Sequence, residues 1–143
     1  MEYISNNYEE TINIGYLIGC KLKKGDVLLL TGDLGAGKTT FTKGIGKFLN
    51  VKKIINSPTF TIVKTYKGDL PLYHLDLYRL DGEGNDFDLE DYFYSDGITV
   101  CEWPTQVSSI LPSEYLEIKI ERLDEDKRKI TIIPVGCRYE GRF

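Results

Sequence analysis

Cysteine is scarce in this sequence of 143 residues, which contains only Cys20, Cys101 and Cys137. Their number is odd and their spacing is wide, so they form neither a Cys-x-x-Cys pair nor a Cys/His zinc pattern. A disulfide framework of the kind found in small secreted domains is therefore excluded. We expect three free thiols in a reducing cytoplasm.

Long apolar runs are also missing. No stretch approaches the ~20 apolar residues that a helix needs to cross a bilayer. The first ten residues, MEYISNNYEE, are acidic and polar and lack the apolar core of a secretion signal. We therefore expect a soluble, cytoplasmic protein with no membrane partner.

Charge of one sign does not accumulate along the chain. The net charge is -4, and basic residues cluster only in short groups such as the pairs Lys23-Lys24 and Lys52-Lys53. A chain without a basic stripe is not expected to bind nucleic acid strongly by itself. The composition, 41% apolar and 28% charged, is that of a globular protein, and 143 residues fit one domain, residues 1–143.

Hydrophobic periodicity predicts helices separated by strands. Helical spacing covers 8–22, for which Ser5 is a plausible N-cap, and 38–49. Strand patterns occupy residues 27–31, 58–66, 70–80, 98–103, 115–123 and 128–134. The second and third of these runs are expected to form a hairpin, and so are the last two. The order predicts an α/β domain with a mixed sheet rather than a regular βαβ array.

One short stretch carries the strongest chemical signal. Residues 32–39, GDLGAGKT, match G-x-x-x-x-G-K-[ST] between a predicted strand and a predicted helix. Glycines let backbone N–H groups converge on phosphate oxygens, and the helix N-terminus adds a favourable dipole. We expect Lys38 to be exposed and to reach the β- and γ-phosphates, while the Thr39 hydroxyl binds Mg²⁺. The motif predicts a nucleoside triphosphate, but neither its base nor the reaction.

Two carboxylates stand at the ends of predicted strands. Asp76 and Glu102 could each hold the metal or orient an attacking water, or could be ordinary solvated acids. His74 is the only histidine and lies two residues before Asp76, on the same strand face. For His74 alone, a packed or hydrogen-bonded structural role is favoured over a catalytic one. Arg79 could pair with phosphate or with nearby acids.

Four segments taken together indicate a family. In this order, GDLGAGKTTF, NSPTFTIV, YHLDLYRL and CEWP closely resemble the TsaE family over nearly the whole chain. This resemblance implies a P-loop ATPase domain with a three-layer fold, a mixed central sheet flanked by helices, and a C-terminal β-hairpin. It also implies a role in threonylcarbamoyladenosine modification of tRNA, with a TsaB–TsaD heterodimer as partner and tRNA reached only through that complex. TsaD would carry out the transfer itself.

The resemblance also implies roles for individual residues toward ATP or ADP and Mg²⁺. The residues expected to contact nucleotide are Tyr8, Thr11, Leu34, Gly35, Ala36, Gly37, Lys38, Thr39, Thr40, Ser57, Thr59 and Arg128. Thr39 and Glu102 would bind Mg²⁺, and Asp76, Lys38 and Glu102 would serve catalysis. Lys127 is an alternative to Arg128 at the last hairpin. The tail CRYEGRF has no counterpart that we can interpret.

Three rival functions were weighed against this one. A small P-loop kinase usually needs several lid arginines, whereas four of the five arginines here lie in the last hairpin and tail. A signalling GTPase would need Asn-Lys-x-Asp, and the nearest match, residues 66–69, lacks the leading Asn. A nucleotide-gated binding module with almost no productive hydrolysis overlaps with the TsaE hypothesis. We expect slow hydrolysis by the chain alone, since only His74 and Arg79 lie near enough to assist.

Overall fold

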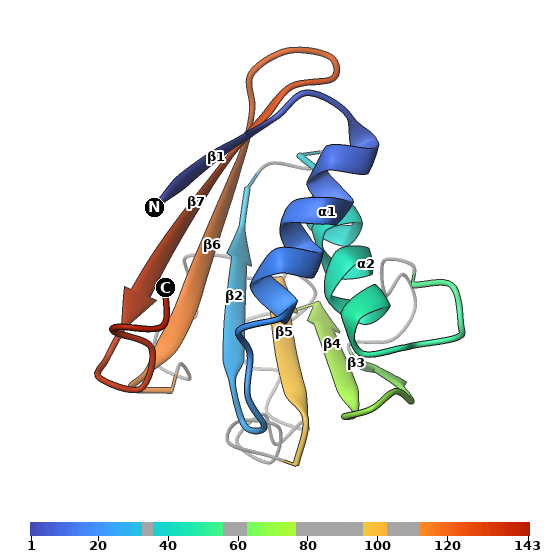
Figure 1. Ribbon diagram of the computed structural model, residues 1–143, viewed down its shortest axis with the longest axis vertical. Coiled ribbons are helices and arrows are strands. Elements are labelled where there is room, and N and C mark those ends of the chain that lie inside the picture. The colour runs from blue at the N-terminus through green and yellow to red at the C-terminus, as the bar shows by residue number, and fades with distance from the viewer. Residues whose placement is uncertain (33–35, 56–62, 77–95, 103–111) are drawn as a thin grey trace, which may run out of the picture.

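The computed structural model describes residues 1–32, 36–55, 63–76, 96–102 and 112–143. Within these ranges the elements are β1 (Glu2–Ser5), α1 (Tyr8–Gly19), β2 (Val27–Thr31), α2 (Lys38–Phe48), β3 (Val63–Tyr66), β4 (Leu72–Asp76), β5 (Ile98–Glu102), β6 (Tyr115–Arg122) and β7 (Arg128–Val135). Among the described residues, helices and strands alternate up to α2, and all the later elements are strands (Figure 1).

The described strands form one sheet in the order β1-β7-β6-β2-β5-β4-β3. The inner strand β2 is parallel to both of its neighbours, β5 and β6, and β4 is parallel to β5. The pairs β1–β7, β6–β7 and β3–β4 are antiparallel. The expected α/β class, mixed sheet and C-terminal hairpin are confirmed, as is the predicted hairpin of β3 and β4 over the described residues.

The two described helices lie side by side over one face of the sheet (Figure 1). Two glycines make their close contact possible. A Cβ atom on Gly15 of α1 would collide with the carbonyl oxygen of Phe41, and one on Gly44 of α2 would collide with that of Ile12. The start of α1 is thereby held close to the start of α2, where the glycine loop ends.

The strand β2 is buried on both faces. Val27, Leu28 and Leu30 have no exposed surface, as expected for an inner strand that reads as a continuous apolar run. The same core contains Phe41 and Ile45 of α2, Val100 of β5 and Ile118 of β6. This burial fixes the carboxyl end of β2, and with it the point where the glycine loop begins.

The N-terminal segment differs from the sequence-based prediction. Residues 2–5 form the edge strand β1 against β7, which the sequence pattern did not indicate. Ser5 therefore ends a strand, and Asn7 caps α1 by accepting a hydrogen bond from the Glu10 N–H at 2.9 Å. The prediction of Ser5 as the cap was wrong, because Ser5 pairs with Arg128 as the last residue of β1 and the helix begins only at Tyr8. The helix also ends at Gly19 rather than at residue 22.

Candidate functional site

The glycine loop connects β2 directly to α2, as the motif predicted. Gly37 is the N-cap of α2 and has a φ of 108°, a left-handed conformation that favours glycine. Ala36 beside it is buried. Leu34 and Gly35, two further residues of the predicted phosphate cradle, lie outside the described residues.

Lys38 is the first residue of α2, but it is not exposed. Its side chain is buried, with 9% of the residue exposed, and its Nζ donates a hydrogen bond to the Gly32 carbonyl at 2.8 Å. The expectation of a solvent-facing lysine was therefore wrong. The side chain folds back across the loop because the Gly32 carbonyl, at the point where the chain leaves β2, is a close acceptor for the ammonium. The positive charge is thus held inside the loop.

Thr39 and Glu102 face one another across the site. The Thr39 Oγ1 donates to the Glu102 Oε1 at 3.4 Å, although the two residues are 63 positions apart in the chain. Glu102 is the last residue of β5 and is 5% exposed. The parallel register places it between Leu30 of β2 and Asp76 of β4. Strand pairing therefore places the two predicted strand-end acids on neighbouring strands, side by side in the backbone. The side chain of Asp76 lies outside the described part of the structure.

This arrangement fits a magnesium ion better than a metal that needs a full protein cage. Magnesium prefers oxygen ligands and usually combines one or two carboxylates with substrate phosphates and water. A threonine hydroxyl and a glutamate carboxylate beside the glycine loop supply that partial set. In the described ranges, no group of three or more His, Cys, Asp or Glu side chains could hold a metal alone.

His74 adds a third polar group to the same place. It lies on β4 with no exposed surface, and its Nε2 is 3.4 Å from the Glu102 Oε1. The bond links the interior of β4 to the end of β5. A hydrogen-bonded rather than free histidine agrees with the sequence-based preference.

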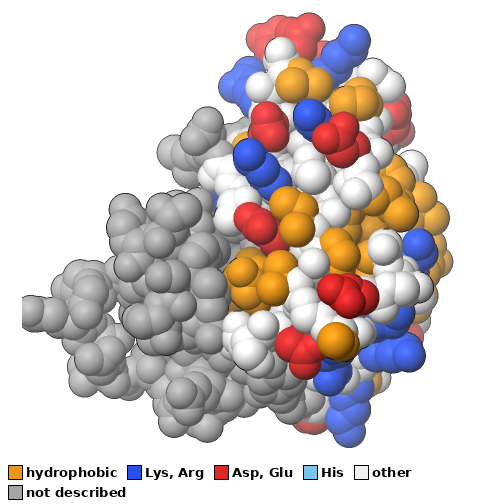
Figure 2. Space-filling view, turned by 90° about the vertical axis from the view of Figure 1, so that its left-hand side faces the viewer, with side chains coloured by type: hydrophobic (Ala, Val, Ile, Leu, Met, Phe, Trp, Pro, Cys, Tyr) orange, Lys and Arg blue, Asp and Glu red, His pale blue; other side chains and the backbone are white. Residues whose placement is uncertain are grey.

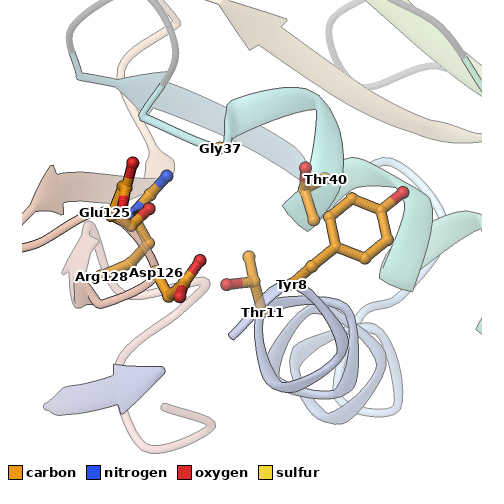
Figure 3. A pocket seen from close by; sticks show the side chains of 7 residues that line it. All are labelled: Tyr8, Thr11, Gly37, Thr40, Glu125, Asp126 and Arg128. Atoms are coloured by element: carbon orange, nitrogen blue, oxygen red, sulfur yellow. Dashed lines mark hydrogen bonds between the residues drawn. The ribbon is translucent and has the colours of Figure 1, made fainter. Parts of the chain in front are cut away.

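A pocket of about 210 Å³ opens next to the loop (Figure 3). Its lining residues are Tyr8, Thr11, Gly37, Thr40, Glu125, Asp126 and Arg128. They come from the first turns of α1, the start of α2 and the β6–β7 turn, three segments far apart in the sequence. Five of the seven were predicted to contact nucleotide. The pocket is large enough for part of a nucleoside.

Tyr8 forms the side of the pocket nearest α2. The residue is about half exposed, and the Lys43 Nζ lies 5.5 Å from the ring centroid and donates to the Tyr8 hydroxyl at 2.9 Å. An exposed aromatic ring held in this way offers a flat apolar surface at the mouth of the pocket.

Arg128 joins the last hairpin to the glycine loop. Its Nε donates to the Ala36 carbonyl at 2.8 Å. Its Nη1 donates to the carbonyls of Asp124, Glu125 and Lys127, so the same side chain also shapes the β6–β7 turn. The sequence left Arg128 and Lys127 as alternatives, and the structure places Arg128 in the pocket.

Two pocket residues were missed from the sequence, and others cannot be placed. Glu125 and Asp126 stand in the charged turn DEDK, which was interpreted only as a hairpin connection. Nothing in their spacing marks them, because only the folding of the hairpin toward α1 brings them to the pocket. Ser57 and Thr59, predicted near the γ-phosphate, lie outside the described residues, as does Arg79.

The surface at the β1–β7 side of the molecule carries mixed charge. On this face, the basic and acidic side chains of the described residues are interspersed with apolar ones, without a continuous basic stripe (Figure 2). No helix in the described ranges is both long and apolar enough to cross a membrane.

Comparison with known proteins identifies close relatives. The family model described as "Threonylcarbamoyl adenosine biosynthesis protein TsaE" matches residues 5–130. A Bacillus subtilis protein of that name is 51% identical over 135 residues, covering 94% of this chain and 85% of its own length. A Nostoc protein of the same name is 44% identical, covering 90% and 83%. The crystal structure of Bacillus subtilis YdiB matches 99% of this chain with a TM-score of 0.86, 45% identity and 90% coverage of its own chain.

Proposed function

The chain belongs to the TsaE family, and on that premise we propose that it binds and hydrolyses ATP in the threonylcarbamoyladenosine modification of tRNA. It acts in the cytoplasm with a TsaB–TsaD complex, is not the transferase itself, and meets tRNA through that complex. The absence of a basic stripe on the face shown in Figure 2 supports indirect rather than direct tRNA binding.

One observation carries the nucleotide assignment. The start of α2 combines the left-handed Gly37, the Lys38 ammonium held inside the loop and the Thr39 hydroxyl facing Glu102. A helix N-terminus with a lysine beside it is suited to phosphate, and the hydroxyl–carboxylate pair is suited to Mg²⁺. The pocket between α1 and the β6–β7 turn then takes the adenosine part.

Each residue has a separate task in this proposal. Lys38 exchanges its bond to the Gly32 carbonyl for phosphate oxygens, and Thr39 and Glu102 hold Mg²⁺, which neutralises charge on the phosphates. Asp76 orients the attacking water from the end of β4, beside Glu102 in register. Among the described residues, few cationic groups lie beside the glycine loop to stabilise the transferring phosphoryl group, so turnover is slow until the partners bind.

The division between Asp76 and Glu102 provides the test. Asp76→Asn keeps its shape but cannot polarise water, so it should keep ATP affinity and lose about 10²- to 10⁴-fold in partner-stimulated turnover. Glu102→Ala removes a metal ligand and should weaken Mg²⁺-dependent ATP binding as well. ATP affinity is measured by calorimetry and turnover by phosphate release, each with and without TsaB–TsaD.

The outcomes separate the proposal from its rivals. Normal turnover by Asp76→Asn within the complex makes Asp76 structural. Equal or tighter binding of GTP in a competition titration contradicts the adenine assignment. If the complex modifies tRNA while it releases no more phosphate than TsaB–TsaD does without this chain, the chain is a nucleotide-gated binding module and the ATPase proposal fails.

A further inference from the structure

The buried histidine of β4 contacts the acid proposed to bind Mg²⁺. His74 has no exposed surface, and its Nε2 lies 3.4 Å from the Glu102 Oε1. The Thr39 Oγ1 lies at the same distance from the same oxygen. Among the described residues, both polar neighbours of the Glu102 carboxylate therefore use Oε1, and Oε2 is left without a described hydrogen-bond partner.

The chemistry of the pair determines the direction of the bond. An ionised carboxylate can only accept hydrogen bonds, so His74 must donate and Nε2 must carry the proton. Nδ1 of a neutral ring is then an acceptor. That nitrogen is buried and has no hydrogen-bond partner within the part of the chain that the structure describes.

An unpartnered buried nitrogen destabilises the folded protein, so packing does not explain a histidine at this position. The neighbouring core residues Leu72 and Leu75 show that β4 accommodates apolar side chains that are fully buried. An apolar side chain at position 74 would avoid the desolvation cost of Nδ1. What only the imidazole supplies is the hydrogen bond from Nε2 to Glu102.

We propose that His74 is a positioning residue, which fixes the Glu102 carboxylate through Nε2 so that Oε2 is available to Mg²⁺. The inference rests on the proposed function, since it concerns the metal of an ATP complex. A donor behind a metal-binding group restricts its rotation and holds it in the orientation that the metal requires. Because His74 lies in the interior of β4, the orientation is set by the sheet rather than by a loop.

The first test needs no metal. The chain contains one histidine, so the imidazole signals in a long-range ¹H–¹⁵N spectrum of labelled wild-type protein belong to His74 without further assignment. We expect a ring protonated at Nε2, with signals that shift in Glu102→Ala. A ring protonated at Nδ1 alone, or one that averages rapidly between the two tautomers, overturns the proposal. The tautomer itself is measured on wild-type protein, so that result does not depend on whether Glu102→Ala folds.

The second test separates positioning from packing. The measured quantity is the Mg²⁺ concentration that gives half of the maximal increase in affinity for a non-hydrolysable ATP analogue. In His74→Leu this concentration should rise about 10- to 100-fold, the usual effect of losing a group that supports a metal ligand. The affinity of this variant for the analogue in EDTA should be unchanged. His74→Gln carries an amide donor that can reach toward Glu102, so it should recover most of the Mg²⁺ response.

The results are distinguishable from a failure of the proposed function. If wild-type protein binds the analogue but shows no response to Mg²⁺, the metal assignment itself is wrong. If wild type responds and His74→Leu has the same Mg²⁺ midpoint, the positioning role is overturned. Equal losses of affinity with and without Mg²⁺ in a folded His74→Leu protein, checked by circular dichroism, also overturn it.

Discussion

The two ends of β2 differ in how completely the buried carboxylate found there is hydrogen-bonded. At the amino end, Asp26 has no exposed surface and accepts hydrogen bonds from the Lys23 N–H, from Arg138 and twice from Arg142, at 2.7–2.9 Å. At the carboxyl end, Glu102 has two contacts of 3.4 Å, both on one oxygen. The Asp26 carboxylate is satisfied on both oxygens by short hydrogen bonds within the protein. The Glu102 carboxylate has long contacts on one oxygen only, so it can still bind a ligand.

Residues of the C-terminal tail supply most of the hydrogen bonds at the amino end of β2. The Tyr139 hydroxyl, which is buried, accepts a hydrogen bond from the Val27 N–H at 2.7 Å at the first residue of β2. Burial raises the pKa of Tyr139 to about 12. Burial lowers the pKa of Arg138, but the hydrogen bond and charge of Asp26 outweigh it and raise this pKa overall. Through Tyr139, the tail that we could not interpret from sequence thus contributes a side chain to the core of the domain.

The comparison indicates that stability and function are separated along one strand. Both ends are fixed by the apolar interior of β2, which is buried throughout. Mutations at the amino end should therefore change the free energy of unfolding with little effect on nucleotide binding, and mutations at the carboxyl end should do the reverse.

The largest effect is expected at the amino end. Asp26→Ala leaves two arginines without their buried partner, which should lower the free energy of unfolding by about 3–5 kcal/mol. Urea denaturation measures this loss, and ADP affinity should be unchanged at temperatures where the protein is folded. The matched control is Glu121→Ala, whose ion pair with Lys119 is solvent-exposed and 3.7 Å long. It should cost no more than about 1 kcal/mol. A comparable loss in both variants would remove the distinction between the two ends.

At the carboxyl end, Lys38→Ala should weaken ATP and ADP binding by about 10- to 100-fold or more, because each charge-assisted hydrogen bond to phosphate contributes about 1.5–3 kcal/mol. Calorimetry measures the affinity, and denaturation should show a smaller change than in Asp26→Ala. Lys47→Ala is the control, since Lys47 lies on the same helix and is exposed. Unchanged ADP affinity in Lys38→Ala would contradict the assignment of the glycine loop to nucleotide binding.

Alkaline pH should destabilise the amino end through Tyr139. The folded-state pKa of Tyr139 is raised above its ordinary value near 10, so the folded protein holds this proton more tightly than the unfolded chain does. The resulting stability is complete below about pH 10 and is lost as the pH rises from about 10 to 12. We expect a loss of up to about 3 kcal/mol, measured by urea denaturation across this range. Tyr139→Phe should be less stable at neutral pH but less dependent on pH. Identical slopes for the two proteins would contradict this origin.

The smallest effect concerns the contact between the last hairpin and the glycine loop. Arg128→Ala removes the bond to the Ala36 carbonyl, and a hydrogen bond of this kind contributes about 0.5–1.5 kcal/mol. Affinity for ADP should fall by about 2- to 10-fold. Lys127→Ala, next in sequence but not among the pocket residues, should bind as wild type does. If Lys127→Ala shows the larger loss, the choice between the two basic residues is reversed.

Much of the carboxyl end could be predicted from the sequence, because its chemistry is local. The glycines, Lys38 and Thr39 are adjacent, and their spacing between a strand and a helix predicts the loop and the left-handed Gly37. The strand-end position of Glu102 was equally predictable from the apolar run before it. The exposure of Lys38 was not, because a lysine's burial depends on whether an acceptor such as the Gly32 carbonyl lies within its reach.

What the sequence determined by itself is the glycine loop and the elements other than β1, since these follow from periodicity and from residues that are neighbours in the chain. Only the tertiary structure decided which distant residues meet. The pairing of β1 with β7, the clamp of Arg138 and Arg142 on Asp26, and the approach of Glu125 and Asp126 to Tyr8 all join segments more than 100 residues apart. No local pattern records such contacts, because strand order and helix packing create them when the chain folds.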